Sequence, residues 1–231
     1  IGAACAIDLA KKGARVVINY TKSEAEARAT QAECERLGAE TLLVKADVAV
    51  DADCQRMAQA ALEKWGRIDA LVNNAGTTRV AFNHADLNAL QAQDFLDVYA
   101  VNVVGTFQMI RAVEPAMRKQ GQGAIVNVSS IAGVMGVGTS VAYAASKGAL
   151  NTMTLSLARV LGPQIRVNAV CPGFVETRWL QNALGERYEA QRARVASTSP
   201  LQRTSTPEDI SRVIVWLIEG ADMVTGEFII V

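Results

Sequence analysis

The side chains best suited to chemistry lie in one short stretch of the chain, between Asn127 and Lys147. Tyr143 and Lys147 are four residues apart at the start of an apolar pattern typical of a helix, so both side chains are predicted to lie on one face of that helix. An ammonium beside a phenol favours the phenolate, so we expect Tyr143 to have a pKa well below its ordinary value of about 10. Such a phenol exchanges protons near neutral pH.

A pair of hydroxyl groups precedes this helix. The run from Ala124 to Ser129 is predicted to be a buried strand that ends in Ser129 and Ser130. The carboxyl edge of a parallel sheet is where open α/β folds build their sites. A Tyr-x-x-x-Lys spacing by itself mostly marks a solvated helix turn, but its position just after this strand favours a site. The sequence thus predicts a hydroxyl, a phenol and a cation around one carbonyl group.

Strand-like and helix-like segments alternate along the whole chain, and the strands are almost continuously apolar. This pattern predicts a single Rossmann-like α/β domain, in which a doubly wound parallel sheet is covered by helices on both faces. The strands are expected at residues 15–19, 41–46, 69–73, 124–129, 165–170 and 228–231. The helices are expected at 3–12, 23–37, 53–65, 94–119, 143–161 and 207–219, with a loop-rich segment at 174–206. The Thr206-Pro-Glu-Asp209 sequence is expected to cap the last of these helices.

The first residues, Ile1 and Gly2, open directly into a helix. We therefore expect the first central strand of the sheet to be missing here, leaving a gap beside the 15–19 strand. The native chain is expected to extend upstream of Ile1.

Composition excludes several classes of function. The chain has 231 residues, half of them hydrophobic, with 23 Lys+Arg against 23 Asp+Glu. This balance of charge does not indicate the basic surface that binds nucleic acid or an anionic membrane. In addition, no apolar run reaches the roughly 18 residues of a membrane span. The four cysteines have no CxxC spacing, so we expect no metal site and no disulfide framework, but reduced thiols in a cytoplasmic enzyme. His84, in a polar stretch, is interpreted as a loop surface residue.

Seven motifs in order make the chain similar to the short-chain dehydrogenases/reductases of the compact bacterial type, over essentially its whole length. The glycine loop of that family is missing except for its last residues. The matching residues are Ile1-Gly2, Asp47-Val48, Asn73-Asn-Ala-Gly76, Asn102, Ser130, Tyr143 with Lys147, and Pro172-Gly173 with Thr177.

The resemblance implies hydride transfer between a nicotinamide and a carbonyl or alcohol carbon. By the same resemblance, Ser130 hydrogen-bonds the carbonyl oxygen and Tyr143 delivers the proton. Lys147 is implied to hold the nicotinamide ribose and to lower the pKa of Tyr143. Asn102 is implied to keep a water behind Lys147, although a buried Asn that bonds backbone is the alternative.

The resemblance also implies the cofactor-binding residues. Asp47 and Val48 are expected against the adenine, although Asp47 could be a helix cap. Thr177 is expected on the carboxamide unless it only caps the next helix. The further contacts are expected from Ile1, from Asn74, Ala75 and Gly76, where a Gly turn lets backbone approach closely, and from Pro172, Gly173 and Val175.

The residues after the 15–19 strand bear on cofactor choice. An NAD enzyme presents Asp or Glu to the ribose 2′-hydroxyl at this point. Here the chain has Tyr20, Thr21, Lys22 and Ser23, with no carboxylate and one positive charge. The sequence favours NADP, and NAD stays an alternative.

The 174–206 segment is expected to act as a lid over the substrate. Its apolar residues Trp179, Leu180, Leu184 and Tyr188 either contact substrate or merely pack the small helices of the segment. Its basic residues suit an acidic carrier protein or a phosphorylated substrate, or else form a solvated face; they are Arg178, Arg187, Arg192 and Arg194. Similar chains are often 3-oxoacyl-carrier-protein reductases, but sugar and alcohol dehydrogenases share the same frame.

Two of the predicted helices, 94–119 and 142–161, are apolar on more than one face. Such helices need a second partner, and together with the resemblance they predict a homotetramer.

Three hypotheses remain for function. The first is an NADP-dependent ketoreductase, with acyl carrier protein as a candidate partner, and the second is an NAD-dependent alcohol or sugar dehydrogenase. The third is a non-catalytic dinucleotide-binding regulatory protein. The presence of all four residues Asn102, Ser130, Tyr143 and Lys147 argues against it, because a protein without turnover does not need them together.

Overall fold

Parallel strands form the centre of the molecule, as predicted from the alternating pattern. The computed structural model describes residues 1–231. Its main sheet has the order β3-β4-β5-β6, and every pairing in it is parallel. These strands are β3 (Ala70–Asn73), β4 (Gly123–Val128), β5 (Ile165–Cys171) and β6 (Phe228–Ile230).

The sheet is split beside the first strand of the chain. β1 (Val16–Tyr20) pairs in parallel with β2 (Thr41–Lys45) and with no other strand. β1 and β3 are not hydrogen-bonded to each other. The gap expected beside this strand is therefore present.

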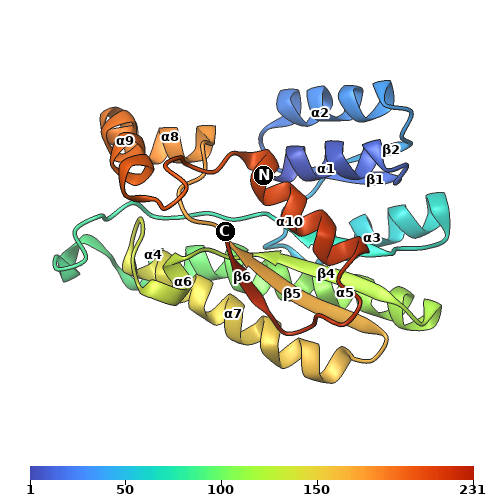
Figure 1. The fold of residues 1–231 in the computed structure, drawn as a ribbon. Helices are drawn as coiled ribbons and strands as arrows, with labels where there is room; N and C mark the ends of the chain where they lie inside the picture. The colour runs from blue at the N-terminus through green and yellow to red at the C-terminus, as the bar shows by residue number, and fades with distance from the viewer.

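Helices cover both faces of the sheets, with α1 and α10 above them and α5 and α7 below them in the view of Figure 1. Side chains of α3, α5 and α7 pack together with one face of the central strands. Side chains of α1 and α10 pack with the opposite face, and α2 covers β1. The bounds are α1 (Gly2–Lys11), α2 (Glu24–Arg36), α3 (Asp51–Trp65), α5 (Thr106–Gln120), α7 (Val141–Leu161) and α10 (Pro207–Glu219).

The two faces of the central strands are buried in different apolar clusters. Ile125 of β4 and Val167 of β5 pack on the α5 and α7 side, whereas Val126 and Val170 pack on the α10 side. Successive side chains of a strand point to opposite faces, so a strand buried on both must be apolar throughout. This is why these strands are almost continuous apolar runs in the sequence.

The long helix predicted over 94–119 is present, but it contains a π turn that the sequence pattern does not show. The structure has α4 (Ala92–Tyr99), a π-helical segment η2 (Ala100–Gly105) and then α5. Two tertiary contacts fix η2: Gly105 lies so close to Val48 that a Cβ would stand 2.8 Å from its Cγ2, and the buried Asn102 bonds two other segments, as described below. A π-helical turn inside a helix is frequently found at a functional site.

A close contact between two helices sets the position of Lys147. Gly133 of α6 (Ala132–Met135) lies against the backbone of α7, and a Cβ on it would stand 2.4 Å from the carbonyl carbon of Lys147. α7 begins where Ser140 accepts a hydrogen bond from the Tyr143 N–H at 3.1 Å. The first turns of α7 are therefore tied to the chain that leaves β4.

The 174–206 segment is closed at its base and helical in its middle. Its two ends meet in a parallel bridge between Val175 and Ser205, and α10 follows with the predicted cap, in which Thr206 and Asp209 bond each other's backbone N–H. Between the ends lie α8 (Arg178–Leu184), the 3₁₀ turn η3 (Gly185–Arg187) and α9 (Tyr188–Thr198).

Outside this segment, a second 3₁₀ turn, η1 (Leu87–Ala89), lies in the loop after β3.

Candidate active site

A cavity of about 1010 Å³ opens where the chain leaves β3, β4 and β5. The residues that follow parallel strands meet at one edge of the sheet, so segments distant in sequence share the wall of this cavity. Most of the predicted site residues line it: Ile1, Asn74, Ala75, Gly76, Ser130, Tyr143, Lys147, Pro172, Gly173, Val175 and Thr177.

The hydroxyl, the phenol and the cation predicted to act together do face the same cavity. Tyr143 and Lys147 are on successive turns of α7, and the Lys147 Nζ lies 5.7 Å from the centre of the Tyr143 ring. Ser130 follows the end of β4, and its Oγ accepts a hydrogen bond from the Ala132 N–H at 3.1 Å. One carbonyl group in this cavity can therefore meet two hydroxyl groups beside an ammonium.

Lys147 is almost completely buried, with 4% of its surface exposed. Its Nζ donates one hydrogen bond, to the Val128 carbonyl at the end of β4, at 2.7 Å. Burial lowers the pKa of Lys147 to about 8, and the Cys171 thiol acts weakly in the opposite direction. Because an ammonium has three N–H donors, Lys147 keeps donors for a ligand in the cavity.

The prediction that Tyr143 has a lowered pKa is wrong for the protein described here. Burial raises the pKa of Tyr143, and the neighbouring Ser130 hydroxyl offsets only part of that rise. Desolvation disfavours the phenolate, while the Lys147 ammonium is directed at the Val128 carbonyl and not at the phenol oxygen. Tyr143 is therefore a neutral phenol near pH 7, which is the form that donates a proton.

Asn102 lies in the middle of η2 and is completely buried. Its amide oxygen accepts from the Thr77 N–H at 2.8 Å, and its amide nitrogen donates to the Thr77 carbonyl at 2.9 Å and to Ser146 Oγ at 3.0 Å. Ser146 in turn donates to the Tyr143 carbonyl at 2.7 Å. Asn102 thus joins the loop after β3 to α7, and its predicted water contact behind Lys147 stays a prediction.

The Asn73–Gly76 motif divides into a structural and a cavity-facing part. Asn73 is buried and donates to Asn127 Oδ1 of β4 at 2.9 Å, so it holds two strands together. Asn74, Ala75 and Gly76 line the cavity. A Cβ on Gly76 would lie 3.7 Å from the Lys147 Nζ, which shows how near this backbone runs to the ammonium.

The residues predicted to bind the adenosine half of the cofactor lie apart from the cavity, at the carboxyl ends of β1 and β2. Thr21 Oγ1 donates to the Ala46 carbonyl at 3.1 Å, which ties Tyr20, Thr21, Lys22 and Ser23 to the end of β2.

Asp47 and Val48, which follow β2, are used locally. Asp47 Oδ1 accepts from the Ala49 N–H at 3.0 Å in a local turn. The alternative interpretation of Asp47 as a helix cap is wrong, because α3 begins after Val50 and has no side-chain cap. Val48 is buried against Gly105, and its carbonyl accepts from Gln108 Nε2 at 2.7 Å. Their adenine contacts stay a prediction.

The 174–206 segment supplies the outer wall of the cavity. Trp179, Leu180 and Leu184 line it, and the Trp179 ring lies 6.0 Å from the Tyr143 ring. Tyr188 does not line it: this buried side chain packs on Phe174, with ring centres 5.5 Å apart. Thr177 faces the cavity and also caps α8 by accepting from the Leu180 N–H at 3.2 Å.

Sequence reasoning missed the loop after Gly76 as part of the site. Thr78 and Thr139 share a hydrogen bond of 2.6 Å, and the Ala81 N–H donates to the Thr139 carbonyl at 2.7 Å. These contacts bring Phe82 into the cavity wall. No local pattern identifies such a loop, because its place depends on pairing with residues about 60 positions away.

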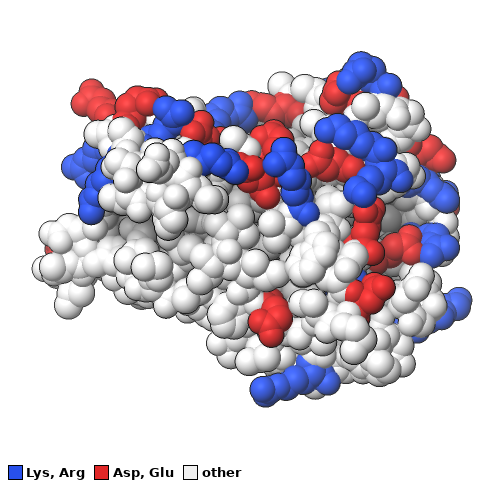
Figure 2. Space-filling model, viewed as in Figure 1, with Lys and Arg blue, Asp and Glu red and all other residues white.

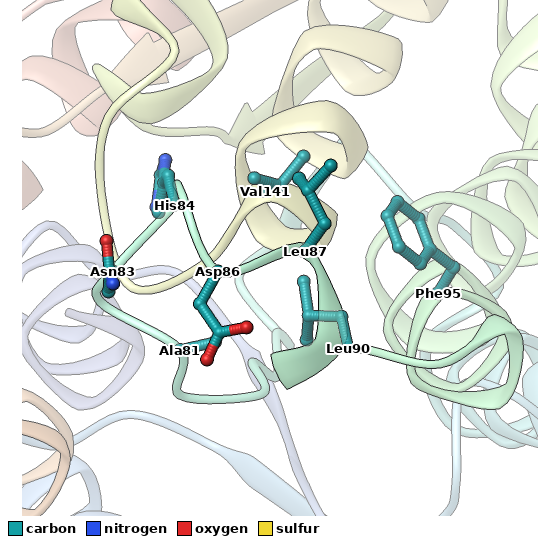
Figure 3. Close-up of a pocket in the computed structure, with 8 residues that line it drawn as sticks. All are labelled: Ala81, Asn83, His84, Asp86, Leu87, Leu90, Phe95 and Val141. Atoms are coloured by element: carbon teal, nitrogen blue, oxygen red, sulfur yellow. The ribbon is translucent and has the colours of Figure 1, made fainter.

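A second, smaller cavity of about 80 Å³ lies beside His84 (Figure 3). Its wall includes the apolar side chains of Leu87, Leu90, Phe95 and Val141, and none of the predicted site residues. His84 lies in a turn, as expected for a loop residue, but it is only partly exposed, and its Nε2 is buried without a hydrogen-bond partner. No Ser, Thr, Cys, Tyr or Lys lines this cavity, and the Asp86 side chain beside His84 accepts a hydrogen bond from the Asn88 N–H. The cavity therefore lacks the pairing of a hydroxyl or thiol with a histidine that a Ser-His or Cys-His mechanism needs.

The larger cavity fits a nicotinamide dinucleotide. It runs from Ile1 past Gly76 to Thr177, and its volume of about 1010 Å³ lies at the upper end of ligand sites. Gly76 presents bare backbone, and Lys147 keeps N–H donors suited to the paired hydroxyl groups of a ribose. The cofactor class predicted from the sequence therefore agrees with the donors and the space present.

Neither metal nor membrane features add to the site. Nowhere in residues 1–231 do three or more His, Cys, Asp or Glu side chains gather in a way that could hold a metal ion. None of the helices combines the length and the apolar character needed to cross a membrane.

Comparison with known proteins agrees with this site. The family model described as "Enoyl-(Acyl carrier protein) reductase" matches residues 1–231. A protein of Streptomyces violaceoruber, named provisionally as ketoacyl reductase 2 of the granaticin polyketide synthase, is 41% identical over 100% of this chain and 90% of its own length. The 3-oxoacyl-[acyl-carrier-protein] reductase of Synechocystis sp. is 35% identical over 98% of this chain and 89% of its own length.

Solved structures give the same result. A crystal structure from Burkholderia xenovorans, described provisionally as a short-chain dehydrogenase/reductase, superposes with a TM-score of 0.91 and 40% identity, covering 99% of this chain and 90% of that one. This protein belongs to the short-chain dehydrogenase/reductase family. It is accordingly an oxidoreductase that uses a nicotinamide dinucleotide.

Proposed function

We propose that the protein is an NADPH-dependent ketoreductase that reduces a carbonyl group to an alcohol, with a 3-oxoacyl thioester as substrate. The meeting of Ser130, Tyr143 and Lys147 at one cavity supports this activity. The names of the two relatives reported above, a ketoacyl reductase and a 3-oxoacyl-carrier-protein reductase, support the substrate class and acyl carrier protein as its carrier.

The protein's own groups handle the oxygen of the carbonyl. A bound reduced nicotinamide supplies the hydride that adds to the carbonyl carbon. Ser130 Oγ donates a hydrogen bond to the carbonyl oxygen, where negative charge develops. Tyr143, whose raised pKa keeps it neutral, gives its proton to that oxygen and completes the alcohol. Lys147 holds the cofactor ribose with the N–H donors that Val128 does not use.

Substitution of Tyr143 tests this proposal directly. Tyr143→Phe removes the proton donor and keeps the ring, so kcat for reduction of a 3-oxoacyl thioester is expected to fall by about 10³-fold, while the Kd for NADPH stays within about threefold. Tyr188→Phe is the matched control, because that phenol packs on Phe174 outside the cavity. Unchanged turnover in Tyr143→Phe refutes its role, and NADPH binding without turnover in the wild type points to the regulatory alternative.

The cofactor preference is proposed from the residues after β1. Lys22 provides positive charge, Thr21 and Ser23 provide hydroxyl groups, and Tyr20–Ser23 contains no carboxylate. A 2′-phosphate suits these groups better than a free 2′-hydroxyl does. We expect kcat/KM for NADPH to exceed that for NADH by about tenfold or more, and Lys22→Glu to narrow the ratio. A preference of the wild type for NADH favours the alcohol or sugar dehydrogenase instead.

A homotetramer is proposed from the uncharged surfaces. Leu96 of α4 and Phe107 of α5 are 62% and 44% exposed, and Phe228 and Ile230 of β6 are exposed as well. Figure 2 shows that the surface over α4, α6 and α7 carries few charged side chains compared with the opposite half of the molecule. Exposed apolar faces of this kind mark interaction sites. Light scattering at micromolar concentration is expected to give four times the mass of 24.6 kDa, and a monomer would contradict this assembly.

We further propose that residues 1–231 act as one domain, with the 174–206 segment as its substrate lid. The cytoplasm is the proposed compartment, because its reducing conditions keep thiols free. All four cysteines are free and buried.

A further inference from the structure

The last residue of η3 and one face of α9, which follows it directly, carry polar side chains that the reduction chemistry does not use. Arg187, Gln191 and Arg194 all line the larger cavity. Their spacing of four and three residues places them in one row along a helix. The row extends the cavity wall outward from Leu180 and Leu184, on the side away from β4.

The arginines of the 174–206 segment fall into two classes. Arg178 pairs with Glu26 at 2.6 Å, and Arg192 pairs with Glu176 at 2.9 Å and with Glu189 at 3.6 Å. Arg187 and Arg194, the two that line the cavity, have no carboxylate partner within ion-pair distance. The whole chain has equal numbers of Lys+Arg and Asp+Glu, 23 each. Two guanidinium groups without a carboxylate partner beside one cavity are therefore a local excess of positive charge.

Arg187 is also positioned by an aromatic ring from across the cavity. Its guanidinium lies 5.9 Å from the centre of the Phe82 ring, which belongs to the loop after β3. This cation–π contact orients the guanidinium plane. It leaves the N–H donors free, because the ring face attracts the positive charge without accepting a hydrogen bond from the edge of the guanidinium group. In Figure 2, basic and acidic side chains both lie at the end of the molecule where Figure 1 draws α9.

We infer that Arg187, Gln191 and Arg194 form a subsite that binds an anionic group of the substrate at the outer end of the cavity. The inference rests on the proposed carbonyl reduction and extends it. Between the subsite and Tyr143 the wall is apolar, formed by Trp179, Leu180 and Leu184. The substrate is therefore an amphipathic ketone: its carbonyl meets Tyr143, an apolar portion crosses this wall, and a phosphate or carboxylate meets the two guanidinium groups.

A binding experiment tests the subsite without turnover. Saturation with NADP⁺ also prevents the probes from binding where the cofactor's own phosphates bind. Protein saturated with NADP⁺ is titrated by calorimetry with 4′-phosphopantetheine and with pantetheine, which differ only by the phosphate. Wild type is expected to bind the phosphorylated probe about tenfold more tightly, and Arg187→Gln with Arg194→Gln is expected to abolish that difference. Arg192→Gln, which removes one charge from the other face of α9, is expected to preserve it.

Kinetics then distinguish the two sources of negative charge. With acetoacetyl-phosphopantetheine as substrate, KM is expected to rise about tenfold in Arg194→Gln with kcat little changed, while KM for the neutral N-acetylcysteamine thioester stays constant. If the native anion is a carboxylate, 9-oxodecanoate, in which an apolar chain separates the ketone from the carboxylate, shows the selective KM rise relative to its neutral methyl ester, and the phosphorylated thioester does not. The effect should shrink as salt is raised, because the arginines are exposed.

Three results would overturn the subsite. The first is equal binding of the two pantetheine probes together with equal KM changes for 9-oxodecanoate and its methyl ester. The second is equal KM changes for charged and neutral thioesters, and the third is an Arg192→Gln effect as large as that of Arg194→Gln. Failure of the proposed function has a different signature. In that case no ketone is reduced with either cofactor, yet wild type still prefers the phosphorylated probe and the double variant does not.

Discussion

The two walls of the cavity are held in place by different forces. On the α7 wall, Lys147, Ser146 and Asn102 are buried, and each bonds a neighbouring segment through a buried or half-buried hydrogen bond. On the opposite wall, Tyr188 is the one buried residue of α8, η3 and α9. Exposed ion pairs such as Arg178 with Glu26 tie that wall to the rest of the molecule.

The difference in burial predicts a difference in function. Hydrogen bonds to a buried charge are strong and costly to leave unmade, whereas exposed ion pairs contribute about 0–1 kcal/mol. Groups that must be held accurately during a reaction belong on the first kind of wall, and groups that recognise varied substrates belong on the second. Substitutions on the α7 wall should therefore change kcat and folding stability, and those on α9 should change KM.

The largest effect is expected for Lys147→Met. Loss of the ammonium should lower kcat/KM for NADPH by at least about 100-fold. Because burial of the charge lowers the pKa of Lys147 from 10.5 to about 8, its removal should raise the free energy of unfolding at pH 7 by up to about 3 kcal/mol. Turnover and urea unfolding measure both effects, and Lys119→Met, on the exposed end of α5, is the control.

The stability gain of Lys147→Met has a defined pH window. Below about pH 8 the lysine is charged in both the folded and the unfolded wild type, so the cost of burying the charge is fully present. Between about pH 8 and 10.5 the folded state loses its proton first, so wild-type stability rises relative to the variant. A difference between the two proteins that stays constant up to pH 10.5 would contradict burial as the cause of the pKa shift.

The second effect concerns the contact that positions Lys147. Gly133→Ala puts a Cβ at 2.4 Å from the Lys147 backbone, so α6 must move away from α7. We expect a loss of about 1–3 kcal/mol in unfolding free energy and a fall in kcat as the ammonium is displaced. Gly148→Ala, across the same contact, places its Cβ at an ordinary 3.4 Å from the Gly133 carbonyl oxygen and should cost less than half as much. Equal costs would mean that the α6–α7 contact does not hold the site.

Much of the α7 wall could be predicted from the sequence, because its determinants are local. The Tyr143–Lys147 spacing fixes a shared helix face, Ser130 follows an apolar strand directly, and the continuous apolar runs of β4 and β5 predict a sheet buried on both faces. The Thr206–Asp209 cap likewise predicts the start of α10 within its own four residues.

The errors arise where distant segments decide the outcome. The pattern at 94–119 correctly predicts a helix, but it does not show the π turn inside that helix, where Gly105 packs on Val48 and Asn102 bonds Thr77. The raised pKa of Tyr143 depends on how deeply the ring is buried and on the Val128 carbonyl that attracts Lys147. The sequence leaves Tyr188 open as a substrate contact, because its pairing with Phe174 is invisible in the local pattern.

The third prediction concerns the pH dependence of cofactor use. The Lys147 ammonium, with a pKa of about 8 in the cofactor-free protein, is the form with the most N–H donors for the ribose. We expect kcat/KM for NADPH, which reports ionisations of the free enzyme, to be level below pH 8 and to decline above it. In Lys147→Met the remaining activity should lack this bend. A wild-type profile that stays level to pH 9.5 would separate cofactor binding from the charge of Lys147.

The smallest effect is expected for the ion pairs that hold α9. The Arg192 guanidinium and, more strongly, the Thr204 hydroxyl keep the pKa of Glu176 below its ordinary range. Both members of the pair are partly solvated, with 45% and 30% of their side chains exposed, so Arg192→Gln should lower the unfolding free energy only slightly. High salt should remove that cost, and so should acid, because the Glu176 carboxylate loses its charge as the pH falls through its lowered pKa. A loss of stability in urea unfolding as large as that of Gly133→Ala would show that this wall is held as firmly as the α7 wall. The distinction between a fixed catalytic wall and a loosely held recognition wall would then be wrong.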